Sequence, residues 1–419
     1  MRSISVVAAA LTGPLLYGTA RRAAGGGRTG RLAGAIAALL WVSMPFASRY
    51  AQEARPYAVV ALLVTASTYL LLRASTGRSG DRAPHGWWVA YALSLPAIVA
   101  TNTVALLVVL GHAGWILSGP ARHRWPGLLA AGAGALLCLP LLWAQSTQQA
   151  QVAFLQRPEA HELVAHATFA LGSPAGAVVA AVAAVVAVVL ARARRLVLLG
   201  ALWGVVPVPL LWLVSQVHPF WTTRYLVFVA PGTCLLLAAV ATVALPAAVP
   251  LGRRVRGALP VAAAAVLVAA MTATGLPMQV VFRSPVIGHG ENMRATAAYV
   301  EREKQAGDAV LFLPDGDYRY RVINQLYPAA FAGVRDVALA RTAEESSTLV
   351  GVERTPDDLT AAMAGVQRVW VIGGPGPVVT ASAGDKRKAE LLAQGYRLVS
   401  EHDERAFSVR LYVAVPAAG

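Results

Sequence analysis

The sequence predicts an all-α membrane bundle of about ten transmembrane helices, followed by a small exterior domain of α/β class. Hydrophobic residues make up 57% of the 419 residues and charged residues only 14%, which is far more apolar than an ordinary soluble domain. The apolar residues gather in runs whose lengths approach the thickness of a bilayer. The composition changes to mixed charge near residue 278, so we expect two domains, 1–277 and 278–419.

Ten apolar runs fill most of the first domain. A helix needs about 20 apolar residues to cross the hydrocarbon core, and several of these runs are shorter. The runs cover residues 4–20, 32–48, 57–72, 87–99, 103–118, 127–145, 175–191, 196–214, 224–246 and 258–276. The two runs between residues 87 and 118 fit either one long helix or two brief ones.

Arginines in alternate loops set the predicted orientation. Residues 1–277 contain 20 arginines and four acidic residues, whereas residues 278–419 balance 16 basic against 17 acidic residues. Fifteen of the 20 arginines lie in five alternate loops, namely Arg21, Arg22, Arg28, Arg31, Arg73, Arg78, Arg82, Arg122, Arg124, Arg192, Arg194, Arg195, Arg253, Arg254 and Arg256. By the positive-inside rule these loops are cytoplasmic. The intervening loops then lie outside, at residues 49–56, 100–102, 146–174 and 215–223. The second domain lies on the same side.

The position of the charge also excludes a class of partner. The whole excess behind the formal charge of +15 lies in the membrane half, so we do not expect binding to nucleic acid. Arginine far outnumbers lysine, and alanine, valine and glycine dominate, which is typical of a GC-rich bacterial genome. We therefore expect a multi-pass protein of a bacterial cell membrane with an extracytoplasmic C-terminal domain.

The predicted orientation has a consequence for the start of the sequence. The first run crosses from outside to inside, which leaves Met1, Arg2 and Ser3 on the exterior face with no apolar segment before them to carry them across. We therefore expect a preceding span and exterior loop that this sequence lacks. A reversed first helix or a re-entrant hairpin is the alternative.

The second domain predicts helices that alternate with strands, which is typical of a small α/β layer. An amphipathic helix is expected from Glu291 to Gln305, followed by a buried strand from Ala309 to Leu313. Further strands are expected at 337–340, 366–372, 396–401 and 408–413, and helices at 356–364 and 385–394. The last two strands can form an antiparallel hairpin. Cys138 and Cys234 both fall in apolar runs, so no disulfide is available to this domain.

The first exterior cluster lies between two apolar runs, at residues 48–57. It places Arg49, Glu53, Arg55 and Tyr57 at one membrane surface. Ionisable groups at the end of a spanning helix are costly unless they pair or face water, so by default they indicate a functional site. The alternative is an interfacial anchor with an ion pair between Glu53 and Arg55.

The second exterior cluster lies at residues 215–225, where His218, Arg224 and Tyr225 precede another apolar run. Arginine offers a fork of donors to anionic oxygens, and aromatic rings reside naturally at headgroup depth. The cluster therefore fits a phosphate headgroup. An aromatic belt with an anchoring arginine is the alternative.

Other motifs do not support a site. His161 and His166 are one residue too far apart to share a helix face as zinc ligands do. The glycine-rich segment 373–376 lacks the pattern of a nucleotide-binding loop. Asp315, Asp317 and Tyr318 follow a strand and predict a turn, with contact to an acceptor as the alternative. We predict no metal site and no cofactor, and dependence on a divalent metal stays open.

Two stretches carry a resemblance to a known family: "SRYAQEARPYAVVALLVTASTYLLLRA" from Ser48 and "HPFWTTRYLVFVAPG" from His218. They resemble the polytopic, lipid-sugar-dependent glycosyltransferases that include protein O-mannosyltransferases and lipid A aminoarabinose transferases. The likeness covers about Arg2 to Gly275. It implies transfer of a mannose-like sugar from a polyprenyl-phosphate donor to an acceptor at the exterior face.

The resemblance also implies roles for individual residues. Arg55 and Arg224 would stabilise the phosphate that leaves as an anion. Glu53 would orient Arg49 or Arg55. The donor and substrate site would be completed by Arg49, Tyr57, His218 and Tyr225.

The sequence departs from the family at its catalytic base. Members place the key acidic residue in the first exterior loop, and this sequence starts beyond that point. The base, which must take the acceptor hydroxyl proton, is therefore unknown and expected upstream of Met1. Either the sequence is a fragment with a misassigned start, or it is a degenerate and inactive member.

Two other functions stay open. A multi-pass transporter or lipid-handling protein is one, although transporters place ionisable groups near mid-bilayer and contain paired repeats, neither of which is evident here. A non-catalytic scaffold that uses its exterior domain to bind partners is the other. The predicted partners are the polyprenyl-phosphate-linked sugar and membrane lipid, and the acceptor can be a glycan, a lipid or a protein.

Overall fold

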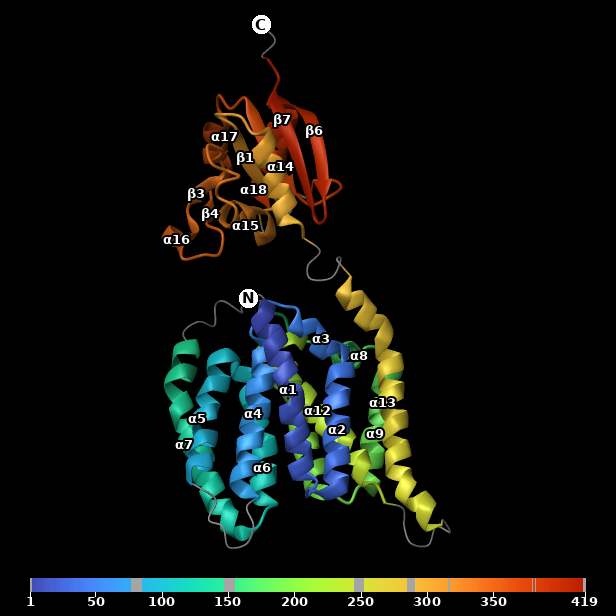
Figure 1. The fold of residues 1–419 in the computed structure, drawn as a ribbon. Helices are drawn as coiled ribbons and strands as arrows, with labels where there is room; N and C mark the ends of the chain where they lie inside the picture. The colour runs from blue at the N-terminus through green and yellow to red at the C-terminus, as the bar shows by residue number, and fades with distance from the viewer. Residues whose placement is uncertain are drawn as a thin grey trace. The chain divides into compact units, whose positions relative to one another are not determined.

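The computed structural model describes residues 2–76, 85–146, 155–244, 252–284, 291–315, 317–378, 380 and 382–416. The chain divides into two compact units, Met1–Ser284 and Pro285–Gly419. Figure 1 shows a helical first unit and a second unit that contains the sheet. The predicted boundary between the two domains, at residue 277, lies inside the last helix of the helical unit. Arg78 and Arg82, assigned to a cytoplasmic loop, lie outside the described residues.

The helical unit, called here the membrane unit, consists of α-helices and short 3-10 helices. In chain order these are α1 (Arg2–Ala23), α2 (Gly27–Ser43), α3 (Pro45–Ala51), α4 (Tyr57–Ser75), α5 (His85–Thr101), η1 (Thr103–Val108), α6 (Val109–Leu117), α7 (Ala121–Ser146), α8 (His161–Leu171), α9 (Pro174–Leu190), α10 (Arg194–Gly204), α11 (Pro207–Ser215), η3 (Thr223–Leu226), α12 (Val229–Ala238), η4 (Ala239–Thr242) and α13 (Arg253–Arg283). Each predicted apolar run contributes to between one and three of these helices.

Fewer helices than predicted are long enough to cross a membrane. Among the described residues, five are long and apolar enough, or seven if two bent pairs are each one span. The other three predicted runs form helices that are too short, α5 and the pairs η1–α6 and α12–η4. A helix of fewer than about 18 residues falls short of the thickness of a bilayer core. Asn102 separates α5 from η1, so the two runs between residues 87 and 118 form two separate segments, α5 and the pair η1–α6, and not one long helix.

Two sharp bends shape the end of the bundle where α3 and α8 lie (Figure 1). α2 and α3 meet at 61°, because Met44 is extended before Pro45, as the residue preceding a proline prefers. α8, which was not predicted, meets α9 at 91°. Gly172 lies between them at φ +88°, and a Cβ on it would lie 2.6 Å from Pro45 Cγ. Glycine therefore lets the two corners pack together.

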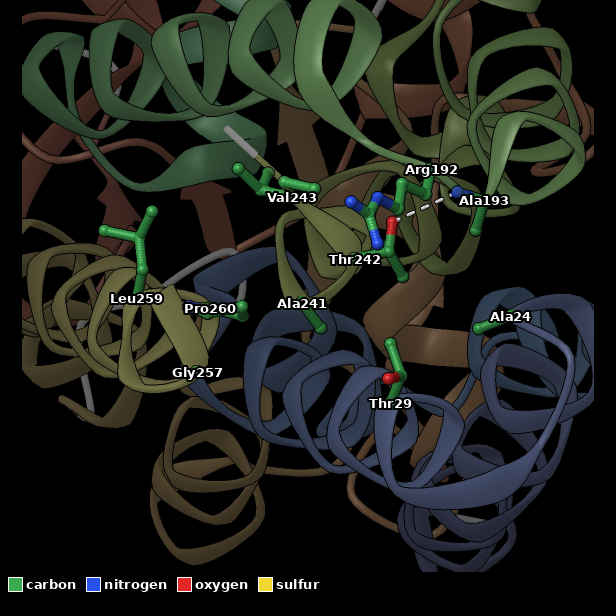
Figure 2. A pocket seen from close by; sticks show the side chains of 11 residues that line it. Ala24, Thr29, Arg192, Ala193, Ala241, Thr242, Val243, Gly257, Leu259 and Pro260 are labelled. Carbon is green, nitrogen blue, oxygen red and sulfur yellow. Dashed lines mark hydrogen bonds between the residues drawn. The ribbon is translucent and has the colours of Figure 1, made fainter. Parts of the chain in front are cut away.

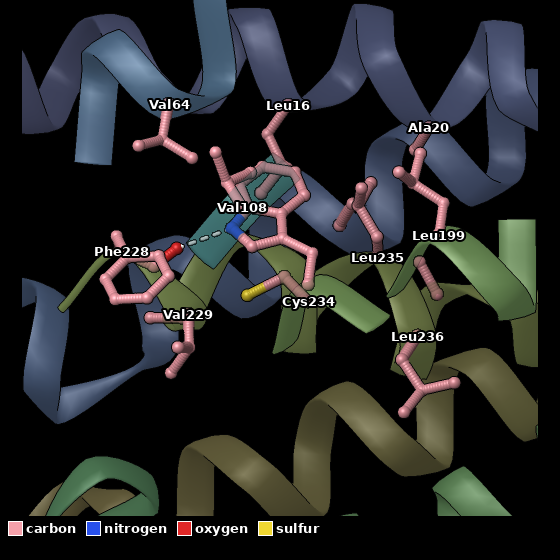
Figure 3. Close-up of a cluster of buried hydrophobic side chains, with 14 of the residues drawn as sticks. Leu16, Ala20, Val64, Val108, Leu199, Phe228, Val229, Cys234, Leu235 and Leu236 are labelled. Atoms are coloured by element: carbon pink, nitrogen blue, oxygen red, sulfur yellow. Dashed lines mark hydrogen bonds between the residues drawn. The ribbon is translucent and has the colours of Figure 1, made fainter. Parts of the chain in front are cut away.

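The core of the membrane unit depends on close approach of α10 and α12. A Cβ on Gly204 would lie 2.2 Å from Thr233 N, and one on Gly200 would lie 2.5 Å from Leu236 N. Small residues four positions apart let helix backbones pack tightly in membrane proteins. Figure 3 shows side chains of the buried cluster, and Trp203 Nε1 donates to Phe228 O at 2.7 Å within it.

The C-terminal unit is a small α/β domain. Its elements are α14 (Met293–Glu303), β1 (Ala309–Leu313), α15 (Tyr318–Leu326), β2 (Arg335–Asp336), β3 (Leu339–Arg341), α16 (Ala343–Ser346), β4 (Val352–Glu353), α17 (Pro356–Met363), β5 (Arg368–Gly373), α18 (Ala383–Gly395), β6 (Tyr396–Glu404) and β7 (Phe407–Ala414). The main sheet has the order β2-β1-β5-β7-β6. β1 is parallel to β2 and β5, while β7 is antiparallel to β5 and β6.

The structure confirms most of the predicted elements of this unit, including the strand 309–313 and the terminal hairpin. Two predictions were wrong. The single strand at 337–340 is divided between β2 and β3, with Val337 and Ala338 buried between them. The turn at Asp317 is the start of α15, because the Asp317 side chain accepts from Arg319 N as a helix cap.

Candidate functional site

The first exterior cluster is organised around an ion pair. α3 ends at Ala51 and α4 begins at Tyr57, so Glu53 and Arg55 lie in a tight connection. Arg49 Nη2 lies 2.8 Å from Glu53 Oε1, and the two side chains are 16% and 14% exposed. The pairing differs from the Glu53–Arg55 pair weighed from the sequence. One helical turn brings Arg49 to Glu53, whereas Arg55 turns to another partner.

That partner is Tyr57. Arg55 and Arg224 both lie within electrostatic reach of the Tyr57 hydroxyl. The Tyr57 ring packs edge-on against Tyr50, with ring centroids 5.1 Å apart. Tyr57 therefore joins the two predicted clusters, which are separated by about 170 residues of sequence.

A serine of α1, which no sequence motif indicates, holds the backbone of the connection in place. Ser5 Oγ lies 2.6 Å from Glu53 O and 3.4 Å from Arg55 O. Ser5 is buried, so its hydroxyl satisfies carbonyl groups that water reaches poorly. The first helix thereby holds the segment that carries the arginine and the carboxylate.

The second cluster is positioned by Asn102. Its side-chain Nδ2 donates to Tyr225 O at 3.1 Å, and its Oδ1 accepts from Val104 N at 3.0 Å. One amide thus caps η1 and ties it to η3, which carries Arg224 and Tyr225. An asparagine just before an apolar run is a helix-start signal, but its bond to residue 225 has no local signal.

The combined cluster carries an excess of positive charge. Arg49, Arg55 and Arg224 face a single carboxylate, Glu53. Among the described residues, Glu53 Oε2 and Arg224 Nε are buried and have no hydrogen-bond partner. Buried polar atoms normally have partners, so these two atoms have unused capacity for an anion or a hydroxyl group.

An apolar cavity of about 860 Å³ opens beside the cluster. Its polar lining includes Tyr57, Asn102 and Tyr225, and Tyr57 lies within electrostatic reach of Arg55 and Arg224. The apolar part is formed by Val104, Leu106, Leu107, Leu142, Leu210, Leu211, Val214 and Phe220. A cavity of this size with apolar walls and a few polar groups at one edge suits an amphiphilic ligand.

The histidines divide between solvent and core. His218 is exposed in the loop after α11, and none of the described contacts of the cluster involves it. His166 is buried on α8 between Phe46 and Trp221, at ring-centroid distances of 5.8 and 6.0 Å. Its Nδ1 has no hydrogen-bond partner among the described residues. His161 is exposed at the start of the same helix.

His166 borders a second apolar cavity, of about 450 Å³, together with Phe46 and Met44. From its sequence position, His166 is predicted only as a weak candidate metal ligand. Within the described ranges, no group of three or more His, Cys, Asp or Glu side chains could hold a metal ion.

Comparison with known proteins finds solved structures with a similar fold. No family model matches the sequence, and no curated protein sequence matches it. ArnT from Cupriavidus metallidurans bound to undecaprenyl phosphate superposes with a TM-score of 0.58 at 14% identity, over 99% of this chain and 84% of ArnT. Apo ArnT gives a TM-score of 0.60 at 15% identity, over 97% and 83%. The arabinofuranosyltransferase AftD from Mycobacteria gives 0.47 at 16% identity, over 98% and 33%.

The likeness to ArnT extends over nearly the full described chain, from the helical unit to the sheet domain. The resemblance noted in the two exterior stretches is therefore confirmed at the level of the fold. The helical region with five to seven candidate spans and the mixed α/β domain after it agree with the predicted class. The chain is a multi-pass membrane protein that has the fold of ArnT.

Proposed function

We propose that this protein transfers a sugar from a polyprenyl-phosphate donor to an acceptor at the face where Arg55 and Arg224 lie. The observation that supports this most strongly is the position of Tyr57, which lines the cavity of about 860 Å³ and lies within electrostatic reach of both Arg55 and Arg224. Tyr225, next to Arg224 in the sequence, lines the same cavity. The phosphate of the donor would meet the arginines while its isoprenoid chain occupies the apolar walls.

The chemistry fits this arrangement. In the transfer, the bond between the sugar's anomeric carbon and the phosphate oxygen breaks, and the acceptor oxygen forms a new bond to that carbon. The acceptor hydroxyl proton passes to a base, and the bonding electrons stay on the phosphate. Arg55 and Arg224 would stabilise this developing charge, since pre-oriented donors act most strongly where charge appears in the transition state.

Glu53 has a positioning role in this proposal. Its Oε1 binds Arg49 at 2.8 Å, and its backbone carbonyl is held by Ser5. The carboxylate therefore keeps the α3–α4 connection in one shape and leaves Arg55 free to face the cavity edge. Arg49 would add to the positive potential, and His218 at the exposed rim would contact the substrate.

The likeness to ArnT supports the choice of donor, because that protein was solved with undecaprenyl phosphate bound. We extend the proposal to the membrane setting. The five to seven candidate spans would cross a bacterial cell membrane, the three shorter helices would pack among them inside the bundle, and residues 278–419 would lie outside. The transferred sugar would be mannose-like, as the sequence resemblance implies.

A donor-turnover assay tests the proposal. Membranes that contain the full-length chain are incubated with mannosyl, aminoarabinosyl and arabinosyl polyprenyl phosphates, and release of polyprenyl phosphate is measured. The double variant Arg55→Ala/Arg224→Ala is expected to lower release by about a thousandfold, because each anion-binding donor contributes about 100-fold to 1000-fold. Insertion and protein level should be unchanged.

The matched control is Arg28→Ala/Arg31→Ala, which removes the same charge from exposed positions of α2. It should turn over donor as the wild type does. Near wild-type release by Arg55→Ala/Arg224→Ala would remove these residues from the site. No release by the wild type from any of the donors would overturn the proposed function.

A further inference from the structure

A second charged cavity lies at the other end of the membrane unit. α1 is 22 residues long, so its end lies about 33 Å from its start, which is close to the thickness of a bilayer core. There the structure has a cavity of about 900 Å³. Its charged lining, called here the arginine pocket, consists of Arg21, Arg22, Arg192, Arg194 and Arg195.

Among the described residues, the arginine pocket has no acidic counterpart, and no Asp or Glu is among the described residues that line the cavity. In the described part of the membrane unit, the acidic side chains are Glu53, Glu159 and Glu162, and all three belong to the end where α3 and α8 lie (Figure 1). Within the described ranges, no neighbouring carboxylate therefore cancels the positive potential of the pocket.

Neutral partners orient several of these side chains without removing charge. The Arg195 guanidinium lies 3.6 Å from the centroid of the Trp115 ring and donates to Trp115 O at 2.8 Å. Arg22 lies 5.4 Å from the centroid of the Tyr69 ring. Arg194 Nη2 donates to Val189 O at 3.2 Å. Such contacts hold guanidiniums in place while they retain donors for an anion.

The pocket adjoins a smaller cavity of about 530 Å³, and the two share Ala24, Arg192 and Ala193. Figure 2 shows the smaller cavity, with the Arg192 side chain beside Thr242. Thr242 is held in place by the Ala193 N–H, which donates to its hydroxyl at 3.3 Å. The remaining wall is largely apolar, formed by Ala241, Val243, Leu259 and Pro260.

We propose that the arginine pocket binds a phosphate group, carried by an anionic membrane lipid of this leaflet or by a free phosphate compound. Topology alone requires only that arginines lie on one side of the membrane, whereas here five of them line one hollow. Arginine forks match phosphate oxygens, and basic pockets between spanning helices bind lipid headgroups. The adjoining apolar cavity would take the glycerol and the first part of an acyl chain. This site is separate from the cluster at Arg55.

Native mass spectrometry of the purified full-length protein tests the proposal. Dioleoyl phosphatidylglycerol, dioleoyl phosphatidylcholine and inorganic pyrophosphate are titrated separately. We expect Arg22→Gln/Arg192→Gln to weaken phosphatidylglycerol binding about tenfold or more, because two charge-assisted contacts are lost. The control Arg122→Gln/Arg124→Gln removes equal charge from the same end at positions that line neither cavity, and it should bind as the wild type does.

The remaining arms distinguish the sources of the phosphate. Pyrophosphate that binds and displaces phosphatidylglycerol identifies a free phosphate as ligand, whereas phosphatidylglycerol binding that pyrophosphate leaves intact identifies the lipid. Equal weakening by both double variants, or equal binding of phosphatidylcholine and phosphatidylglycerol, would overturn the proposal in favour of diffuse surface charge. If the glutamine variant does not fold, Arg22→Lys/Arg192→Lys takes its place, and unchanged phosphatidylglycerol binding would likewise overturn the site.

Discussion

The two units of this protein each contain a cluster of charged side chains, and the clusters are built differently. In the C-terminal unit, Lys388 Nζ lies 2.7 Å from Glu353 Oε2 and 3.6 Å from Asp385 Oδ1. Arg321 Nε lies 3.0 Å from Asp336 Oδ2, and Arg321 also pairs with Glu353. The two cations are almost fully buried, at 0% and 6% exposure, and three carboxylates surround them.

The cluster at the end of the membrane unit has the opposite balance. Of its three guanidiniums, that of Arg49 pairs with the carboxylate of Glu53, and Glu53 Oε2 and Arg224 Nε have no hydrogen-bond partner in the described structure. The network of the C-terminal unit consists of Arg321, Asp336, Glu353, Asp385 and Lys388. Every buried side-chain nitrogen and oxygen of these five residues has a hydrogen-bond partner. A closed network stabilises a fold but binds nothing more, whereas an open cluster beside a cavity can receive a ligand.

The closed network should respond to mutation through stability. Lys388→Met leaves Glu353 and Asp385 short of a buried counter-charge, and breaking such a pair costs about 3–5 kcal/mol. We expect hydrogen exchange of the full-length chain to rise throughout the sheet of the C-terminal unit, with exchange in the membrane unit unchanged. Exchange in the sheet that matches the wild type would show that the network does not stabilise the unit, and the comparison would fail.

The open cluster should respond through ligand binding. Val214 lines the cavity of about 860 Å³ and is 46% exposed, so Val214→Trp can fill the cavity without disturbing the core. We expect binding of undecaprenyl phosphate to weaken about tenfold, as 1.4 kcal/mol of lost contact implies, with stability unchanged. The control is Val217→Trp, at a position that is 70% exposed and outside the cavity. Equal binding by both variants would exclude this cavity as the lipid site.

Glu53→Gln tests the contribution of the one carboxylate among the described residues of the open cluster. The change removes the pair with Arg49 but keeps the shape of the side chain. Transfer should fall about fivefold to tenfold through misplacement of the arginines, since a partly buried charged contact contributes about 1–1.4 kcal/mol. As a positioning residue, Glu53 should leave the acidic side of the pH–rate profile unchanged, because a carboxylate base would limit the rate on that side. A loss beyond a thousandfold with a changed pH profile would instead make Glu53 a catalytic base.

The smallest expected effect concerns a surface ion pair. Arg319 Nε donates to Asp317 Oδ1 at 2.8 Å, which holds the pKa of the Asp317 carboxyl below its ordinary value. A carboxyl of this kind stabilises the fold fully above its unfolded pKa of about 3.9, and its contribution is lost as the pH falls through the lower folded pKa. Asp317→Asn should raise exchange of the α15 amides at pH 6, by about 1 kcal/mol or less. As the pH falls through the lowered folded pKa of Asp317, the variant and the wild type should converge.

Several elements could be predicted because their signals are local. Apolar runs place the helices α1, α4, α7 and α13, and the run 309–313 places β1, since hydropathy and strand pattern belong to the residues themselves. The segment 161–171 was missed because its apolar face is short and interrupted by His161, Glu162 and His166. Three predicted spans form described helices that are too short to cross a membrane. Hydropathy alone does not predict the residue at which a helix ends when it packs against neighbouring helices.

Residue order alone is enough to locate the arginine-rich loops, the apolar runs and the residues of the two exterior clusters, because charge and hydropathy are properties of short segments. Only the tertiary structure decided that Glu53 pairs with Arg49, that Tyr57 and Tyr225 line one cavity, and that Ser5 and Asn102 hold the connecting segments. These contacts depend on how closely helices approach one another, which the glycines of α10 and α12 permit but no single segment specifies.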